Sequence, residues 1–474
     1  MISINVLSQQ LLHALSFVRL KPFDASTPQG RSDERHRRIV LTALVSAAAK
    51  GVTVLTALIT VPLTLKYLGD ERYGLWMTIS SVIAILGFAD LGMGNGLLNA
   101  ISEADGKDDR ETAREYVSSA FFMLSGIAIM LAAMTALIFP MVSWQRFFNV
   151  ASARAVAEAG PAMAVFMGCF LIGLPLGIVQ RVQTGYQEGF ANSLWQGVGN
   201  LLGLGAVLLA IHLKAGLPWL VLAMAGTPAL ASLINAVILF GYHRPWLQPA
   251  WQWVTRTAAT KVFRLGILFF VLQMAVALAF SSDNMVAAQV LGPKAVALYS
   301  VPARLFSVIP MILGMLLNPL WPAYGEAISR GDVGWVRKTL LRSLVAALII
   351  TALPSVLLVL LGPQILKVWV GPDMIPPLSL LVGFAVWTVI GAAGNAVAMF
   401  LNGTNVIGFQ VVVAIVMSVG ALIAKVLFAQ AIGLSGIIWG TVVAYTLFSA
   451  VPQAIYIAKA FSPLHPHTAP PKLL

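Results

Sequence analysis

Twelve long apolar segments, separated by short polar connections, limit what this chain can fold into. They span residues 39–66, 73–102, 116–144, 156–184, 189–212, 216–242, 262–291, 295–325, 338–361, 374–401, 406–431 and 433–458. Each segment reaches the roughly 20 residues that a helix needs to cross a bilayer. Lipid offers the backbone no hydrogen-bond partners, and the segments lack the alternation of strands, so helices are expected. The sequence therefore predicts an all-α integral membrane protein with about twelve transmembrane helices.

The composition excludes an ordinary soluble enzyme. Only 10% of the 474 residues are charged and 59% are hydrophobic, whereas soluble domains carry about 25% charged residues. The single cysteine, Cys169, rules out an intrachain disulfide, and the six histidines lack the spacing of a metal site. No Walker lysine motif or nucleophile turn occurs, so we predict no catalytic residues, no metal and no ATP-driven pump.

Positive charge orients the predicted helices. With a cytoplasmic N-terminus, most of the 30 Lys and Arg fall in cytoplasmic connections, among which we count Arg181. Cytoplasmic loops of membrane proteins carry such an excess. We therefore expect a multi-pass protein of the bacterial inner membrane with both termini in the cytoplasm. Anionic lipid head groups account for the basic excess, so no nucleic-acid partner is expected.

An internal repeat divides the chain into two halves. Residues 67–116 align with 290–339 at a constant offset of 223, and Glu103 aligns with Glu326. The two copies are six segments apart, so both halves have the same orientation. The predicted parts are a basic cytoplasmic tail (1–38), an N-lobe (39–242), a cytoplasmic linker (243–260), a C-lobe (261–461) and a C-terminal tail (462–474). Parallel repeats of this kind are typical of transporters whose substrate path lies between the halves.

Five ionisable residues lie within the apolar segments: Lys50, Asp90, Asp283, Arg304 and Lys425. Each costs about 2.5–3.5 kcal/mol if it faces lipid, so such residues are candidates for a site. Lys50 and Arg304 are the leading candidates for binding an anion in a central cavity, and Lys425 is a third. The alternatives are pairing with a neighbouring carboxylate or, most readily for Lys425, reaching outward to the head groups.

The two carboxylates are candidates for coupling transport to an ion. Asp283 stands in a polar cluster inside its segment and could take a proton or sodium ion, or pair with Arg304. Asp90 lies among glycines and could instead cap a broken helix. Apart from a proton or sodium ion, we predict no cofactor.

The stretch VPLTLKYLGDERYGLWMTISSVIAILGFADLGMGNGLLNAISEADGKDD, residues 61–109, carries a family resemblance. Its YLG-x-x-x-YG-x-W start and DLG-x-G end resemble the O-antigen and exopolysaccharide flippases of the multidrug/oligosaccharidyl-lipid/polysaccharide (MOP) exporter superfamily. The VLG-x-x-x-VALYS stretch at 290–300 is similar to the degenerate second copy. The resemblance implies two six-helix lobes around a central cavity, the MATE-like fold. It also implies that the chain moves undecaprenyl-pyrophosphate-linked oligosaccharides.

The predicted function is thus translocation of a lipid-linked oligosaccharide or polysaccharide precursor to the external leaflet by alternating access. A cation-coupled multidrug antiporter of the same superfamily is one alternative, but such a protein favours acidic cavity groups. A membrane polysaccharide polymerase or ligase is another, but these enzymes usually need a large external loop. The expected partners are the lipid-linked glycan, membrane lipids and polysaccharide polymerase or export proteins.

Overall fold

The computed structural model describes residues 17–19, 21–24, 26–370 and 376–461, and every regular element in them is a helix. Within these residues, eleven helices are long and apolar enough to cross a membrane. The remaining predicted crossing, 73–102, is split into α3 (Asp70–Leu86) and α4 (Met93–Gly106). The predicted all-α membrane fold is therefore confirmed. The C-terminal tail, 462–474, lies outside the described residues.

The chain forms two compact units, Met1–Ile267 and Leu268–Leu474. The division falls inside α11 (Arg256–Ser281), so the predicted linker at 243–260 belongs to the first unit. The first unit also contains α2 (Pro28–Leu68), α5 (Arg110–Ile138), η1 (Phe139–Met141), α6 (Trp144–Phe148), α7 (Ala153–Gly185), α8 (Gly189–His212), α9 (Leu217–Val221), η2 (Leu222–Gly226), α10 (Thr227–Ile238), η3 (Leu239–His243), η4 (Pro245–Leu247) and η5 (Trp251–Trp253).

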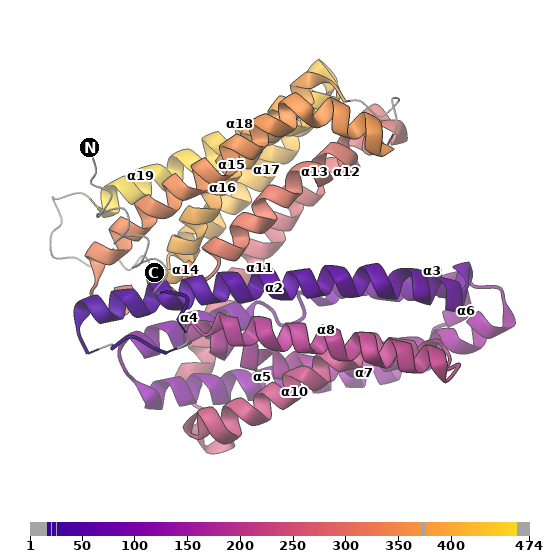
Figure 1. Cartoon of the computed structure of the whole chain (residues 1–474), viewed down its shortest axis with the longest axis horizontal. Coiled ribbons are helices and arrows are strands. Elements are labelled where there is room, and N and C mark those ends of the chain that lie inside the picture. The colour runs from indigo at the N-terminus through magenta and orange to yellow at the C-terminus, as the bar shows by residue number, and fades with distance from the viewer. Residues whose placement is uncertain (1–16, 20, 25, 371–375, 462–474) are drawn as a thin grey trace. The chain divides into compact units, whose positions relative to one another are not determined.

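Helix α2 lies along α8 within the first unit (Figure 1). Small polar side chains join the two helices: the hydroxyl oxygens of Ser46 and Ser193 lie 2.7 Å apart, and Asn200 Nδ2 donates to Thr53 Oγ1 at 2.7 Å. Such hydrogen bonds and small side chains hold helices together in lipid, because burial of apolar surface there provides no hydrophobic driving force.

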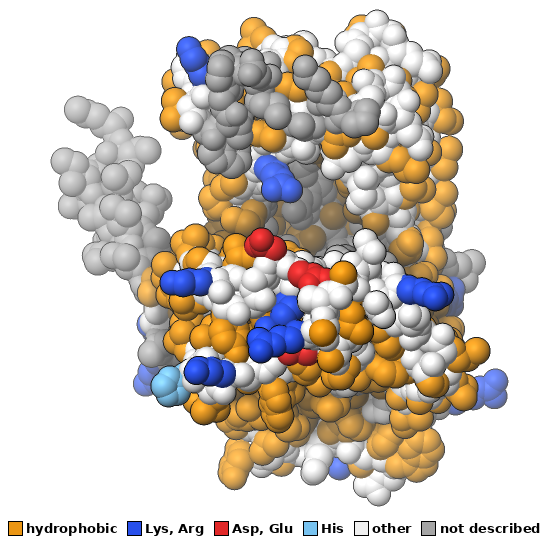
Figure 2. All heavy atoms as spheres, turned by 90° about the vertical axis from the view of Figure 1, so that its right-hand side faces the viewer, with side chains coloured by type: hydrophobic (Ala, Val, Ile, Leu, Met, Phe, Trp, Pro, Cys, Tyr) orange, Lys and Arg blue, Asp and Glu red, His pale blue; other side chains and the backbone are white. Residues whose placement is uncertain are grey.

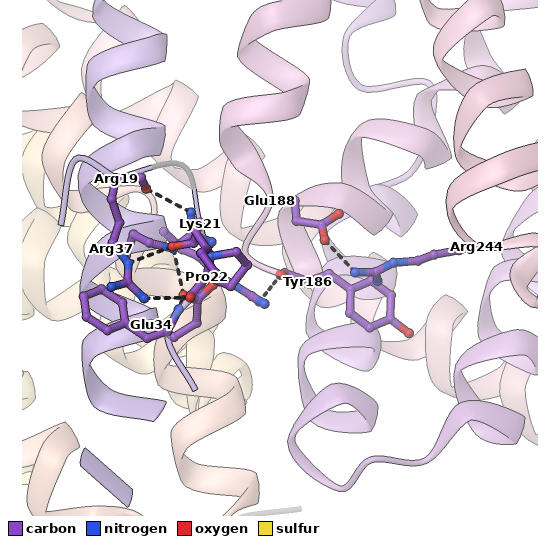
Figure 3. Close-up of polar contacts among 10 residues, drawn as sticks. Arg19, Lys21, Pro22, Glu34, Arg37, Tyr186, Glu188 and Arg244 are labelled. Carbon is purple, nitrogen blue, oxygen red and sulfur yellow. Dashed lines mark hydrogen bonds and ion pairs between the residues drawn. The ribbon is translucent and has the colours of Figure 1, made fainter. Parts of the chain in front are cut away.

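Arg31, Arg35, Arg37 and Arg38, predicted as part of a tail, belong to helix α2. α2 begins at Pro28, where Thr27 Oγ1 accepts the Gly30 N–H at 3.0 Å as an N-cap. The buried carboxylate of Glu34 binds both Arg37 and Arg38 at 2.6 and 2.9 Å (Figure 3). The charges that precede the apolar run thus neutralise one another in part while the helix continues through them.

The predicted linker packs against α5. The N–H of Ala250 donates to Ser118 Oγ at 3.3 Å, and Thr255 donates to Glu115 at 3.0 Å. The ring of Trp251 meets Phe122 edge-on, with centroids 5.0 Å apart, yet Trp251 remains 72% exposed. These contacts attach the connection between the repeats to the first unit.

The second unit continues from α11 with α12 (Asp283–Val286), η6 (Ala287–Leu291), α13 (Pro293–Leu317), α14 (Leu320–Ser329), α15 (Val333–Val370), α16 (Leu378–Gly403), α17 (Ile407–Ile432), α18 (Leu434–Tyr445), η8 (Thr446–Ala450) and α19 (Val451–Ala460). α17 and α18 pack along each other. At Gly440 of α18, an added Cβ would lie 2.7 Å from the backbone nitrogen of Lys425. A glycine there allows the two backbones to touch, as in membrane helix pairs with small residues at the interface.

The outward faces of the helices are apolar. Leu55 and Leu58 of α2 are 62% and 67% exposed, and Leu137 of α5 is 73% exposed. Figure 2 shows hydrophobic side chains over large parts of the surface. Exposed apolar faces of this extent on helices of spanning length are what lipid covers. The chain is therefore a multi-pass membrane protein.

Candidate binding cavity in the first unit

A cavity of about 450 Å³ lies in the first unit, among the end of α3, the start of α4, α5, α7 and α10. Most of its wall is apolar, contributed by Leu86, Leu124, Phe166, Phe170, Ile178 and Met224. Polar side chains also line it: Asp90, Gln180, Arg181 and Ser232. An apolar pocket with a few polar groups is the usual form of a small-molecule site.

Asp90 stands where the second crossing breaks. Its Oδ1 accepts the Gly92 N–H at 2.9 Å, and its Oδ2 accepts the Gly94 N–H at 3.2 Å. Gly92 has φ +70°, which directs the chain from the turn into α4. A carboxylate at a helix start satisfies N–H groups that have no partner within the helix, and the helix dipole favours its charge. The structure thus has the capping arrangement that was one of two readings for Asp90.

Arg181 brings a positive charge to the same cavity from α7. Its Nη1 donates to Asn95 Oδ1 at 2.7 Å. A Cβ on Gly94 would lie 2.8 Å from both Arg181 Nε and Asp90 Oδ2. The guanidinium and the carboxylate therefore meet at Gly94, and only a residue without a side chain leaves both in place.

The placement of Arg181 in a cytoplasmic connection was wrong. It lies within α7, a helix of spanning length, and lines the cavity. The signal was present in the sequence, because Arg181 stands inside the apolar segment 156–184. Because Arg181 lies near the end of that segment, its charge was assigned to the following loop.

The cavity contains one cationic side chain, Arg181, together with polar side chains that can form hydrogen bonds with uncharged oxygen atoms. The carboxylate of Asp90 is engaged by two backbone N–H groups, whereas Arg181 uses Nη1 for Asn95 in the described part of the chain. The other N–H donors of the guanidinium can therefore bind acceptor oxygens of a ligand. Apolar walls strengthen such hydrogen bonds by excluding water. Phosphate and saccharide oxygens suit this arrangement.

Two predicted anion ligands lie outside this cavity. Lys50 is exposed on α2 of the first unit, and Arg304 is exposed on α13 of the second. Neither side chain lines the cavity described above. Their proposed binding of an anion stays a prediction.

Lys425 and Asp283 are brought together in the second unit. The Lys425 ammonium forms an ion pair with Asp283 Oδ1 and is fully buried. The Lys425 side chain does not extend toward the head groups. Asp283 forms its ion pair with Lys425 rather than with Arg304. Among the described residues, no group of three or more His, Cys, Asp and Glu is arranged to hold a metal ion.

A second, polar cavity of about 330 Å³ lies where the α4–α5 turn meets the end of α7 and η4. Arg244 lines it, pairs with Glu188 at 2.6 Å and covers the Tyr186 ring at 3.6 Å (Figure 3). Burial raises the pKa of Tyr186 above its usual range. The phenol therefore stays neutral under the guanidinium.

The sequence matches the family described as polysaccharide biosynthesis protein over residues 40–328. It is 23% identical over 405 residues to a putative O-antigen transporter of Salmonella typhimurium, covering 83% of this chain and 90% of that protein. It is 20% identical over 385 residues to a putative O-antigen export protein of Yersinia pseudotuberculosis, covering 77% and 84%.

Solved structures share the fold at low sequence identity. The crystal structure of MATE in the bent conformation has a TM-score of 0.76 at 17% identity, covering 90% of this chain and 96% of that one. A MOP superfamily transporter from Pyrococcus furiosus has a TM-score of 0.73 at 18% identity, covering 88% and 94%. The architecture is thus that of MOP transporters. Since the family match spans more than half of its residues, the chain belongs to the polysaccharide biosynthesis protein family.

Proposed function

We propose that this protein is a transporter that moves a lipid-linked oligosaccharide or polysaccharide precursor across the bacterial inner membrane, from the cytoplasmic to the external leaflet. Family membership, the O-antigen transporters among its relatives and the MATE-like fold support a transporter rather than an enzyme. Membrane lipids and polysaccharide polymerase or export proteins are the expected partners.

The observation that carries the proposal is the position of the Arg181 guanidinium. It lies in an apolar cavity next to the Asp90 carboxylate, which accepts backbone N–H groups at the start of α4. A phosphate cannot enter hydrocarbon without groups that replace its water, and arginine does so through paired N–H donors. The saccharide hydroxyls can bind Gln180 or Ser232, which line the cavity. The polyprenyl tail needs no protein cavity, because it can stay in the lipid.

The membrane potential supplies part of the driving force. An inside-negative potential favours outward movement of an anion by about 2.3 kcal/mol per charge per 100 mV. We propose that a proton or sodium ion moves in exchange, with Asp90 as the coupling group, since Asp283 is paired with Lys425. Lys50 and Arg304 remain proposed anion ligands elsewhere on the path, whereas the Lys425 ammonium is engaged by Asp283.

The test is transport of a radiolabelled undecaprenyl-pyrophosphate oligosaccharide in proteoliposomes. We would compare the wild type with Arg181→Ala, Lys50→Ala and Arg304→Ala, and use Arg154→Ala, an exposed arginine of the first unit, as the matched control. We expect Arg181→Ala to reduce transport by about 10-fold or more, because a charged hydrogen bond is lost in a buried site. The control should retain it.

Other results would change the proposal in defined ways. Efflux of small cationic dyes without movement of any lipid-linked glycan would replace it with multidrug transport. Full transport by a folded Arg181→Ala variant would keep the substrate and remove this cavity from its path. Loss in Lys50→Ala or Arg304→Ala alone would move the anion site to those residues.

A further inference from the structure

The first crossing of the second unit is interrupted within its apolar segment at one residue, Ser282. α11 ends at Ser281 and α12 begins at Asp283, followed by the π-helix η6. The aligned helix of the first unit, α2, continues from Pro28 to Leu68 without such a break. The repeat offset places Thr60 opposite Asp283. The interruption and its charge are therefore specific to the second unit.

The Lys425 ammonium fills the interruption from the neighbouring helix α17. It donates to the carbonyl oxygen of Ala279 and to Ser282 Oγ, the latter at 3.3 Å, and it pairs with Asp283 Oδ1. The other carboxylate oxygen, Asp283 Oδ2, accepts the Tyr299 hydroxyl at 2.7 Å. Every group that the ammonium touches here is an oxygen, and all three come from the segment 279–283.

Packing buries the ammonium of this cluster, while the Asp283 side chain keeps 20% exposure. Lys425 is 0% exposed, Ser282 is 7% exposed and Tyr299 is 2% exposed. Gly440 of α18 lies against the backbone of Lys425. The buried alanines 421 and 429 stand one helical turn to either side of it. A permanent positive charge in such surroundings needs a full set of oxygen partners.

A carbonyl, a hydroxyl and a carboxylate oxygen at a broken helix are also the ligands that hard metal cations take. In membrane transporters, unwound carbonyls and half-helix C-terminal ends bind sodium ions. Near the end of α11, the carbonyl oxygen of Ala279 accepts from both the Lys425 ammonium and the Ser282 hydroxyl. An ammonium on a lysine stem satisfies these oxygens without an ion from solution.

We propose that the oxygens of Ala279, Ser282 and Asp283 form a monovalent-cation site that the Lys425 ammonium occupies as a tethered cation. The second unit therefore needs no sodium or potassium ion to hold its broken helix. Removal of the ammonium empties the cage, and an alkali cation can then enter it. This inference concerns the cation chemistry of the second unit and does not depend on the transported substrate.

The test measures thermal unfolding of the purified full chain in detergent, in sodium, potassium or choline chloride at about 0.15 M. The wild type should unfold at the same temperature in all three salts. Lys425→Ala should unfold roughly 5–15 °C lower in choline, because it leaves the partly buried Asp283 carboxylate without its cation. Sodium or potassium should restore at least half of that loss.

Three further variants complete the test. Lys338→Ala removes an exposed lysine of the same unit and should respond to no salt. Lys425→Met combined with Asp283→Leu removes both charges, so its unfolding temperature should not depend on the cation. Asp283→Asn weakens the cage, and Lys425→Ala combined with Asp283→Asn should lose the rescue by sodium.

Several outcomes would overturn the proposal. One is specific stabilisation of the wild type by sodium that Asp283→Asn abolishes, because the cage would then take a mobile ion beside Lys425. Another is equal unfolding of Lys425→Ala in all three salts. If Lys425→Ala fails to fold even when prepared in sodium chloride, while the doubly neutral variant folds, an alkali ion cannot replace the ammonium and the proposal is also wrong.

Discussion

The carboxylate of Glu103 accepts a hydrogen bond from the Lys261 ammonium at 2.7 Å, which ties the end of α4 to the start of α11. Its other oxygen accepts from Lys107, one turn along the chain, at 2.6 Å. The repeat places Glu326 opposite Glu103 and Arg330 opposite Lys107, and these two residues also form an ion pair. An ion pair between residues one helical turn apart is thus present in both units. In the first unit, Lys261 adds a second contact to Glu103.

Acid should weaken this link. Burial by itself raises the pKa of Glu103, but its hydrogen bonds with Lys107 and Lys261 outweigh burial, so the pKa lies below its ordinary value. A carboxyl with a lowered pKa stabilises the folded state above its unfolded pKa of about 4.3. That stabilisation is lost as the pH falls through the folded-state pKa.

Lys261→Met tests this link, and its unfolding temperature should drop by an amount corresponding to about 1 kcal/mol, since both groups are partly exposed. Between about pH 5 and about pH 3 the variant should lose less stability than the wild type, because part of the acid-sensitive interaction is already absent. Parallel pH profiles for the two proteins would contradict this assignment.

Gly94 should be needed for the cavity rather than for folding. In Gly94→Ala the new methyl meets Arg181 Nε and Asp90 Oδ2 at 2.8 Å, and the flexible arginine must move. We expect a folded protein with transport reduced about 10-fold, from displacement of the guanidinium. Gly126→Ala in α5, where nothing lies within 4 Å of the added Cβ, is the control. Unchanged transport in Gly94→Ala would show that the position of Arg181 does not matter.

Arg72 and Glu158 join α3 to α7 through two parallel hydrogen bonds of 2.7 and 2.8 Å. Arg72→Lys cannot reproduce both bonds and should lose about 1 kcal/mol of unfolding free energy, and Arg72→Ala about 1–3 kcal/mol. Exchanging the two residues, Arg72→Glu with Glu158→Arg, should recover part of the loss. Thermal unfolding measures all three, beside Lys66→Ala at an exposed site. Equal stability of Arg72→Ala and the wild type would mean that the pair contributes nothing.

Gly440→Ala should separate α17 from α18. The added Cβ would lie 2.7–2.8 Å from backbone atoms of Ala424 and Lys425, which cannot rotate away. Overpacking of this kind costs about 1–3 kcal/mol, so thermal unfolding should shift downward by several degrees. Gly334→Ala near the start of α15, where the added Cβ meets nothing within 4 Å, should be neutral or slightly stabilising. A stable Gly440→Ala variant would show that the helices can part at little cost.

Apolar segment length was enough to predict the helices, because in lipid each segment must satisfy its own backbone. The glycines around the Asp90 carboxylate in an apolar run also indicated a break in the helix there. Segment length could not identify Arg181 as a cavity residue, since a charge near a segment end is equally expected in a loop. The pairing of Lys425 with Asp283 depends on how α17 packs against α11, and neither the repeat nor local spacing contains that information.

The connection between the repeats also bears on how deeply the first unit lies in the membrane. Trp251 stays 72% exposed while its neighbours 250 and 255 are hydrogen-bonded to α5. Tryptophan rings settle at the boundary between hydrocarbon and water. We therefore expect the exposed Trp251 ring to lie at that boundary and to limit how deeply the first unit enters the bilayer.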